Sequence, residues 1–244
     1  LELFQGSGTT AVATNDDWGG GAALSAAFTA TGAFPLASSS RDAVLLISLA
    51  PGTYSARVTG GAATTGTALV EVFETDATQR FAYLSTRANL RVGGVTTGFV
   101  LNSTGNQNVL IRASGALAGS RGAADPSLTV FNGSTAVASN NDWGMAANLA
   151  DINAATVVAG AMPLGAKDAA VLLSLAPGSY TVGTAGGPGF VLTEICVIDG
   201  QRSLSFEPAL IAPLQNRTFR AGSPLSVTAT GVGRPGPITF TWKR

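Results

Sequence analysis

The densest group of polar side chains near the start of the chain is the stretch ATNDDWGGG, residues 13–21, which sets Asn15, Asp16 and Asp17 beside Trp18. Carboxylate and amide oxygens are the hard ligands that Ca²⁺ prefers, and paired carboxylates are the acid and base of glycoside hydrolysis. An aromatic ring beside polar groups also suits a sugar-binding surface. The stretch therefore raises three chemical hypotheses beside the simpler one of a well-formed turn.

A second copy of the stretch, ASNNDWGMA at residues 138–146, narrows these hypotheses. It replaces Asp16 with Asn141, so a two-carboxylate active site is not retained. The oxygen-bearing residues that both copies keep are the predicted calcium ligands: Asn15, Asp17, Asp42 and Glu71 in the first copy, and Asn140, Asp142, Asp168 and Glu194 in the second.

The turn interpretation explains the same residues without a metal. Asn15 and Asp17 would then make local Asx-turn hydrogen bonds, Trp18 would be a core residue, and Asp42 or Asp168 would cap the loop before a strand. The third alternative is a sugar platform built on Trp18 or Trp143. All three interpretations stay open at the level of the sequence.

Residue types that drive common enzyme reactions are missing. Histidine is absent, which excludes a Ser-His-Asp triad, a histidine-based zinc site and an imidazole proton shuttle. The only lysines are Lys167 and Lys243, and the stretch GGVTTG lacks the Lys that would follow it in a phosphate-binding loop. We therefore expect a protein that is not an enzyme and that needs no cofactor other than structural calcium.

Charge is sparse: 11% of the residues are charged, and 14 basic side chains balance 14 acidic ones. This balance leaves no basic footprint for nucleic acid. No apolar run reaches the length of a membrane-spanning helix, so we expect no membrane span. A surface of low charge repels neighbours weakly and suits a protein packed against others, or else a module in a longer polypeptide whose other parts supply solubility.

Short apolar runs broken by Gly, Asn, Ser or Pro-Gly predict an all-β protein built of β-sandwiches. The stretch DAVLLISLAPGTYSARV, residues 42–58, predicts two strands joined by a turn at Pro51-Gly52, with Tyr54 and Val58 inward and Arg57 outward. Residues 148–160 allow one short helix per module at most, with Leu149, Ile152 and Ala155 on one side. Cys196, the only cysteine, lies in an apolar run and is expected to be buried.

Internal repetition sets the predicted domains. The first 78 residues are predicted to be the back half of a module and residues 79–200 a complete module, while residues 201–244 form a third region outside the repeat. The chain thus contains two back halves but only one front half, which lies in the complete module. Either these residues are part of a longer polypeptide, or a neighbouring chain supplies the missing strands by β-augmentation.

The complete module resembles a repeat common in large secreted proteins of environmental bacteria, on the pieces LSTRA, VLIRASG, ASNNDW and LAPGSYT. It is more distantly similar to the bacterial pre-peptidase C-terminal domain, a jelly-roll-like sandwich appended to secreted hydrolases. In residues 201–244, the stretches GSPLSVTATG and PITFTWKR resemble the opening strands of a bacterial immunoglobulin-like domain, without the cysteine of antibody domains. The resemblance implies that this region is a partial immunoglobulin-like domain. These resemblances imply a secreted or cell-surface bacterial protein made of tandem jelly-roll-like or immunoglobulin-like β-sandwich modules.

The sequence as a whole predicts a non-catalytic extracellular structural protein, a subunit or segment of a bacterial fibre, filament or adhesin. Its expected partners are copies of itself or adjoining modules of the same polypeptide, with strand complementation between chains as one route. The alternative is a polysaccharide- or cell-surface-binding module of a large secreted enzyme, with glycans as partners.

Overall fold

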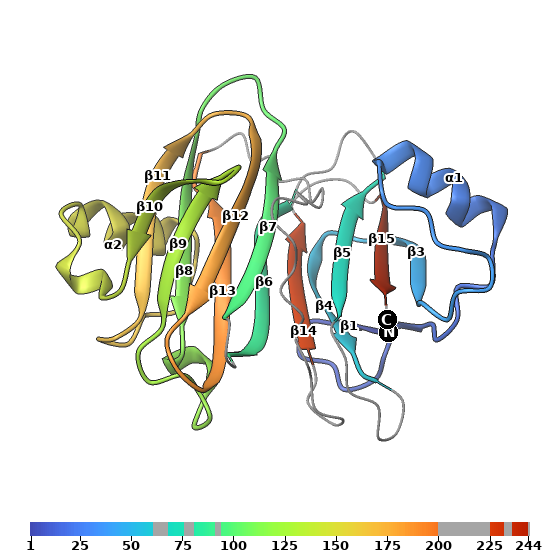
Figure 1. The fold of residues 1–244 in the computed structure, drawn as a ribbon, viewed down its shortest axis with the longest axis horizontal. Helices are drawn as coiled ribbons and strands as arrows, with labels where there is room; N and C mark the ends of the chain where they lie inside the picture. Colours follow the sequence, from blue (N-terminus) through green and yellow to red (C-terminus); the bar gives the residue numbers. More distant parts are fainter. Residues whose placement is uncertain (61–67, 76–80, 91–93, 200–224, 232–235, 244) are drawn as a thin grey trace. The chain divides into compact units, whose positions relative to one another are not determined.

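The computed structural model describes residues 1–60, 68–75, 81–90, 94–199, 225–231 and 236–243 (Figure 1). Two compact units divide the chain, with the boundary at the start of β6. The first unit holds β1 to β5, α1 and the last two strands, β14 and β15, whereas the second holds β6 to β13 and α2. Each unit is a sandwich of two antiparallel sheets.

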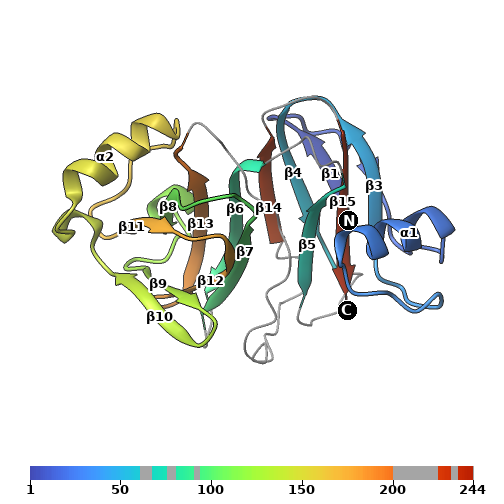
Figure 2. The same cartoon turned by 90° about the horizontal axis from the view of Figure 1, so that it is seen from above.

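The second unit has four strands in each layer, in the orders β11-β8-β13-β6 and β10-β9-β12-β7 (Figure 2). Its strands are β6 (Phe81–Leu90), β7 (Val95–Leu101), β8 (Gln107–Ser114), β9 (Ser127–Asn132), β10 (Thr135–Asn140), β11 (Ala169–Leu175), β12 (Gly178–Ala185) and β13 (Gly189–Val197). Successive strands mostly change layer, so the tight turn between β11 and β12 crosses from one sheet to the other. Both central strands of the first layer, β8 and β13, are almost wholly buried.

The space between the two layers of the second unit is the main core. Phe99 of β7 and Tyr180 of β12 stack with ring centroids 5.4 Å apart, and the hydroxyls of Thr184 and Thr193 meet at 3.1 Å between the layers. The burial of these rings and of the aliphatic residues around them supplies the main stabilisation of the sandwich.

Helix α2 (Leu149–Val158) covers the outer face of the layer that contains β8. Its Ile152 and Ala155 are buried against Leu110, Ala170 and Cys196 of the strands. The face that the sequence predicted for this helix is the one that packs inward, and Cys196 is buried as expected. A second hydrophobic layer thus lies beneath the helix, outside the space between the sheets.

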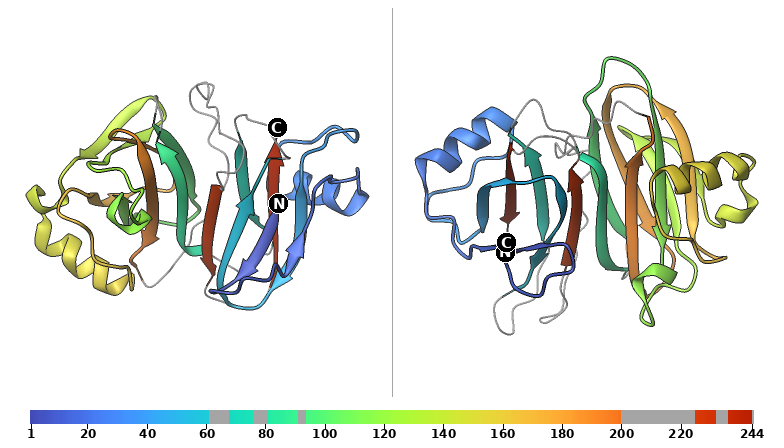
Figure 3. Two further views of the ribbon diagram at one scale, coloured as in Figure 1. Left: turned by 90° about the horizontal axis from the view of Figure 1, so that it is seen from below. Right: turned by 180° about the vertical axis from the view of Figure 1, so that it is seen from behind.

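The first unit repeats this plan with fewer strands. Its layers run β14-β4-β1-β2 and β3-β15-β5 (Figure 3). Its elements are β1 (Glu2–Gln5), β2 (Ala13–Thr14), α1 (Ala22–Thr31), β3 (Val44–Leu49), β4 (Gly52–Val58), β5 (Leu69–Glu74), β14 (Leu225–Gly231) and β15 (Gly236–Lys243). Tyr54, Ala56 and Val58 of β4 are buried while Arg57 is exposed, which confirms the predicted alternation.

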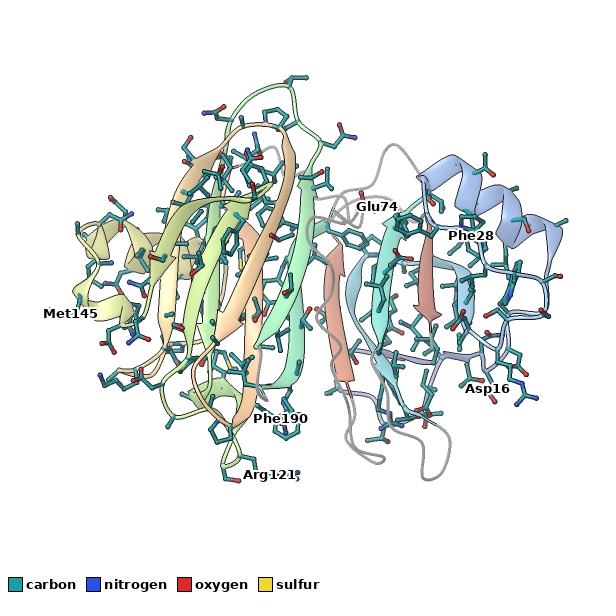
Figure 4. The ribbon with its side chains drawn as sticks, viewed as in Figure 1. Asp16, Phe28, Glu74, Arg121, Met145 and Phe190 are labelled. Carbon is teal, nitrogen blue, oxygen red and sulfur yellow. The ribbon has the colours of Figure 1, made fainter. Side chains whose placement is uncertain are left out.

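Helix α1 lies on the layer that contains β3, in the position that α2 holds in the second unit. Trp18, Phe28, Ala33, Val44 and Phe73 form the buried cluster beneath it. Phe28 points from the helix toward the strands in Figure 4, and its ring lies 5.5 Å from that of Trp18. Both units therefore bury a hydrophobic cluster between one helix and one sheet, and this cluster is largely aromatic in the first unit and aliphatic in the second.

Strands β14 and β15 occupy definite places in this plan. β14 pairs with β4 as β7 pairs with β12, and β15 lies between β3 and β5 as β8 lies between β11 and β13. The sequence assigned residues 201–244 to a separate immunoglobulin-like domain. In the structure the two strands of that segment instead belong to the sheets of the first unit, where they satisfy backbone groups along β4, β3 and β5. Residues 201–224 of that predicted domain lie outside the described residues.

The predicted all-β sandwich class is confirmed. No helix in the described part of the chain is both long and apolar enough to cross a membrane.

Candidate functional site

The two Asn residues of the repeated loops tie each loop to a strand of the layer under the helix. Asn15 Oδ1 accepts a hydrogen bond from the backbone N–H of Val44 at 2.8 Å, and its Nδ2 donates to the carbonyl of Asp17 at 3.1 Å. Asn140 repeats both contacts, with Ala170 at 3.0 Å and with the carbonyl of Asp142 at 3.3 Å. Each amide thus uses its oxygen and its nitrogen on backbone groups of its own unit.

The two Trp residues are held in the same way in both copies. The backbone N–H of Trp18 donates to the carbonyl of Asp42 and that of Trp143 to the carbonyl of Asp168, both at 2.9 Å. Each indole N–H also donates to a loop carbonyl at 2.9 Å, of Ala37 for Trp18 and of Gly165 for Trp143. Trp18 is 6% exposed and Trp143 is half-buried, so both rings pack against their helix clusters.

Asp168 is a buried carboxylate fully engaged with its own loops. It accepts hydrogen bonds from the Ser114 hydroxyl and from the backbone N–H groups of Gly115, Ala116 and Gly165. Asp42, its counterpart, accepts one from the Ser40 hydroxyl. These hydrogen bonds hold the Asp168 carboxylate between the loop after β8 and the loop before β11.

Asp17 and Asp142 lie near the surface, unlike the buried Asp168. Asp17 is exposed at the surface, next to Asp16, which Figure 4 places on the outer loop of the first unit. Asp142 forms a surface ion pair with Lys167 at 3.1 Å. This contact, first through its hydrogen bond and then through its charge, raises the pKa of Lys167.

A buried ion pair lies beneath α2 and joins the predicted calcium ligand Glu194 to Arg112, which the sequence did not single out. Arg112 of β8 is wholly buried, and its Nη2 lies 2.8 Å from Glu194 Oε2 of β13. The same nitrogen donates to the carbonyl of Met162 at 2.7 Å, and the Tyr83 hydroxyl donates to Glu194 Oε1. The sequence does contain a feature that could have predicted this ion pair. Each of the apolar runs VLIRA and LTEIC contains one charged residue, and a charge buried with such a run needs a partner of opposite charge.

The pKa values of this group follow from its burial. Burial raises the pKa of Glu194, and the Arg112 guanidinium and the Tyr83 hydrogen bond act in the opposite direction. Burial, with the Glu194 charge second, also raises the pKa of Tyr83. Burial also raises the pKa of the Cys196 thiol to about 12. The thiol is therefore protonated and unreactive at neutral pH.

Glu71 holds the place of Glu194 in the first unit. It is 3% exposed on β5, and its register partner on the neighbouring strand β15 is Thr241. In the second unit the corresponding register partner of Glu194 is Arg112. The two units therefore share the buried acid but differ at the facing position.

The eight predicted calcium ligands are not brought together in either unit. Among the described residues there is no cluster of three or more acidic, Cys or His side chains that could hold a metal ion. The Asn residues bond to backbone groups, Asp142 pairs with Lys167, and Glu194 pairs with Arg112. This geometry favours the turn interpretation, and calcium binding stays a prediction that a chelator can test.

A small pocket lies beside Asp168, between the loop after β8 and the loop before β11. Its walls are mostly Gly and Ala, with Lys167 at the rim. Gly115 and Gly122 bring two backbone segments so close that a Cβ at Gly122 would lie 1.8 Å from the carbonyl oxygen of Gly115. The pocket is therefore a by-product of tight loop packing around a carboxylate that is already engaged.

Comparison with known proteins gave no match among family models, curated proteins or solved structures.

Proposed function

We propose that this chain is a non-catalytic extracellular structural protein, a repeat-module segment of a bacterial surface fibre, filament or adhesin. The proposal rests on the hydrogen bonds made by the residues that are identical in both repeat copies. Asn15, Trp18 and their counterparts Asn140 and Trp143 direct their polar atoms at backbone groups of their own unit. Residues kept for such contacts serve the fold rather than a reaction.

The composition supports the same proposal. A chain with 11% charged residues and no net charge gives little electrostatic repulsion between molecules, as suits a protein that works in close contact with its neighbours. The first unit is completed by strands from the other end of the chain, so its back half accepts strands that do not follow it directly in sequence. Strand complementation is accordingly the proposed mode of assembly.

Electron microscopy of native material tests the proposal. We expect regular polymers whose repeat matches stacked modules. Monodisperse monomers that bind a glycan array would overturn it and would support the polysaccharide-binding alternative. In that case Trp143 is the residue to replace first, because Trp18 is almost fully buried and cannot offer its ring to a sugar.

A further inference from the structure

The last strand of one layer carries an exposed valine in each unit. In the second unit β10 ends the layer β10-β9-β12-β7, and its Val137 is 45% exposed (Figure 2). In the first unit β2 ends the layer β14-β4-β1-β2, and Val12, the residue before it, is 50% exposed. The two valines hold the same place in the stretches TAVATN, residues 10–15, and TAVASN, residues 135–140. Both repeat copies thus have a β-branched apolar residue at a position that neither sandwich buries.

A β-bulge lies at each of these valines. The register between β10 and β9 shifts at Val137, which has no register partner on β9. In the first unit the N–H of Val12 donates to the carbonyl of Leu3 at 2.7 Å, and the next residue, Ala13, is the register partner of the same Leu3. Two residues of the outer strand therefore face one residue of β1. A bulge redirects a side chain out of the regular alternation, and here it leaves a valine in solvent in both units.

The layer that β10 ends contains no charged residue. Its four strands have the sequences TAVASN, SLTVFN, GSYTVGTA and VTTGFVL. The other three layers each contain charged residues, among them Arg112 in β8, Glu2 in β1 and Glu74 in β5. Edge strands are commonly protected against pairing by charges, above all lysine, or by proline. Because β10 has neither, its outer backbone groups are open to the addition of a strand.

We propose that the outer edge of β10 pairs antiparallel with the β10 edge of a second copy of this chain. The inference rests on the proposed function and names a contact through which the copies associate. A second copy fits because the edge matches itself: a twofold axis brings together two identical uncharged strands with the same bulge and the same exposed valine. A strand without the bulge does not follow the bend of β10. A charged strand would lose its hydration without gaining an opposite charge.

The first unit gives the chain a second edge of the same kind. Residues 10–15 have the bulge and the exposed valine of β10, but β2 itself spans only Ala13–Thr14, whereas β10 spans six residues. Main-chain hydrogen bonds supply the affinity of strand addition, so β10 is the stronger edge and β2 the weaker one. One edge that pairs with itself ends at a dimer, and a second edge allows the chain to continue into a polymer.

Lysine substitution at the exposed valines tests this contact on the full-length chain. Analytical ultracentrifugation over a range of concentrations measures the association constant. We expect Val137→Lys to weaken association at least about tenfold, because like charges would meet across the twofold axis. Val12→Lys should leave dimers and suppress larger species. Val157→Lys, at a valine of α2 that is 80% exposed, is the matched control and should leave association unchanged. Urea unfolding of each variant checks that its sandwiches are intact.

A cysteine at the same position locates the contact. With oxidised glutathione as the oxidant, Val137→Cys should form a disulfide-linked dimer, whereas Val157→Cys, although more exposed, should not. The native Cys196 is buried and takes no part.

Three results would each overturn the edge contact: a chain that stays monomeric at every concentration, equal effects of Val137→Lys and Val157→Lys, or no dimer of Val137→Cys. Polymers in the microscope that Val137→Lys leaves unchanged would overturn the edge contact and leave the proposed function standing. Dimers that depend on Val137, from a chain that never polymerises, would support the edge contact and overturn the proposed function.

Discussion

Arg112 and Glu194 form an ion pair at 2.8 Å in which the two side chains are 0% and 3% exposed. Two further nitrogens of Arg112, Nε and Nη1, have no hydrogen-bond partner among the described residues. Taking both charges out of water is costly, and their attraction offsets that cost only while both are present. Replacing one partner should therefore lower the free energy of unfolding far more than replacing both.

The first prediction concerns this pair. Arg112→Met leaves Glu194 charged and buried, so we expect the free energy of unfolding of the second unit to fall by about 3–5 kcal/mol. Glu194→Met should lower the free energy of unfolding by a similar amount, because it leaves the Arg112 guanidinium buried without an opposite charge. The double variant should be more stable than either single variant, as measured by urea unfolding. Simple addition of the two single losses would contradict this account.

The second prediction concerns the loop asparagines. Asn140→Ala removes the acceptor for the Ala170 N–H and the donor to the Asp142 carbonyl, so we expect a loss of about 1–3 kcal/mol in unfolding free energy. Asn141→Ala, at the exposed neighbouring position, is the matched control and should change little.

The same melting curves measured with and without a chelator test calcium. If the turn interpretation holds, the hydrogen bonds of Asn15 and Asn140 fix both loops, and the melting temperature should be unchanged by chelator. A fall of several degrees that Asp17→Ala or Asp142→Ala abolishes would instead establish the calcium site.

The sandwich class, the α2 face and the buried Cys196 could be predicted from the sequence because each depends on a local pattern. Alternation, helical spacing and apolar runs are properties of neighbouring residues. The Arg112–Glu194 pair and the place of β15 depend on which strands lie side by side. Strand neighbours are set by contacts between segments far apart in the chain, and a single sequence does not reveal them.

The loop residues show the same limit within one motif. Asn, Asp and Trp in the order of the repeated stretch fit a calcium loop and an Asx turn equally well, because both use the same oxygen atoms. The deciding contact, from Asn15 to Val44, spans 29 residues. The sequence motif shows where the loop lies. The hydrogen-bond partner of the Asn15 side chain is known only from the folded structure.

The third prediction uses the pKa of Cys196. Below pH 9 the thiol is protonated in both states. Between the ordinary thiol pKa of 9.0 and the folded-state pKa of about 12, the unfolded state loses the proton while the folded state keeps it. Stability should therefore fall as pH rises through this window, and Cys196→Ala should remove that part of the slope. Tyr83, whose pKa is also raised, adds to the slope above pH 10.

A thiol-reactive dye gives the matching measurement at pH 8. Because Cys196 is 1% exposed and protonated, we expect it to react only when the second unit unfolds. Rapid labelling of the native protein would contradict the buried position of β13.

The last prediction concerns the close backbone contact beside Asp168. A Cβ at Gly122 would lie 1.8 Å from the carbonyl oxygen of Gly115, whose own N–H donates to Asp168. Gly122→Ala must therefore push the loop away from β8 and weaken the hydrogen bonds to that carboxylate, and we expect it to cost about 1–3 kcal/mol. Gly105→Ala, where a Cβ meets open space, should be neutral or raise stability by less than about 1 kcal/mol. Equal effects of the two substitutions on urea unfolding would show that the loop is not held by this contact.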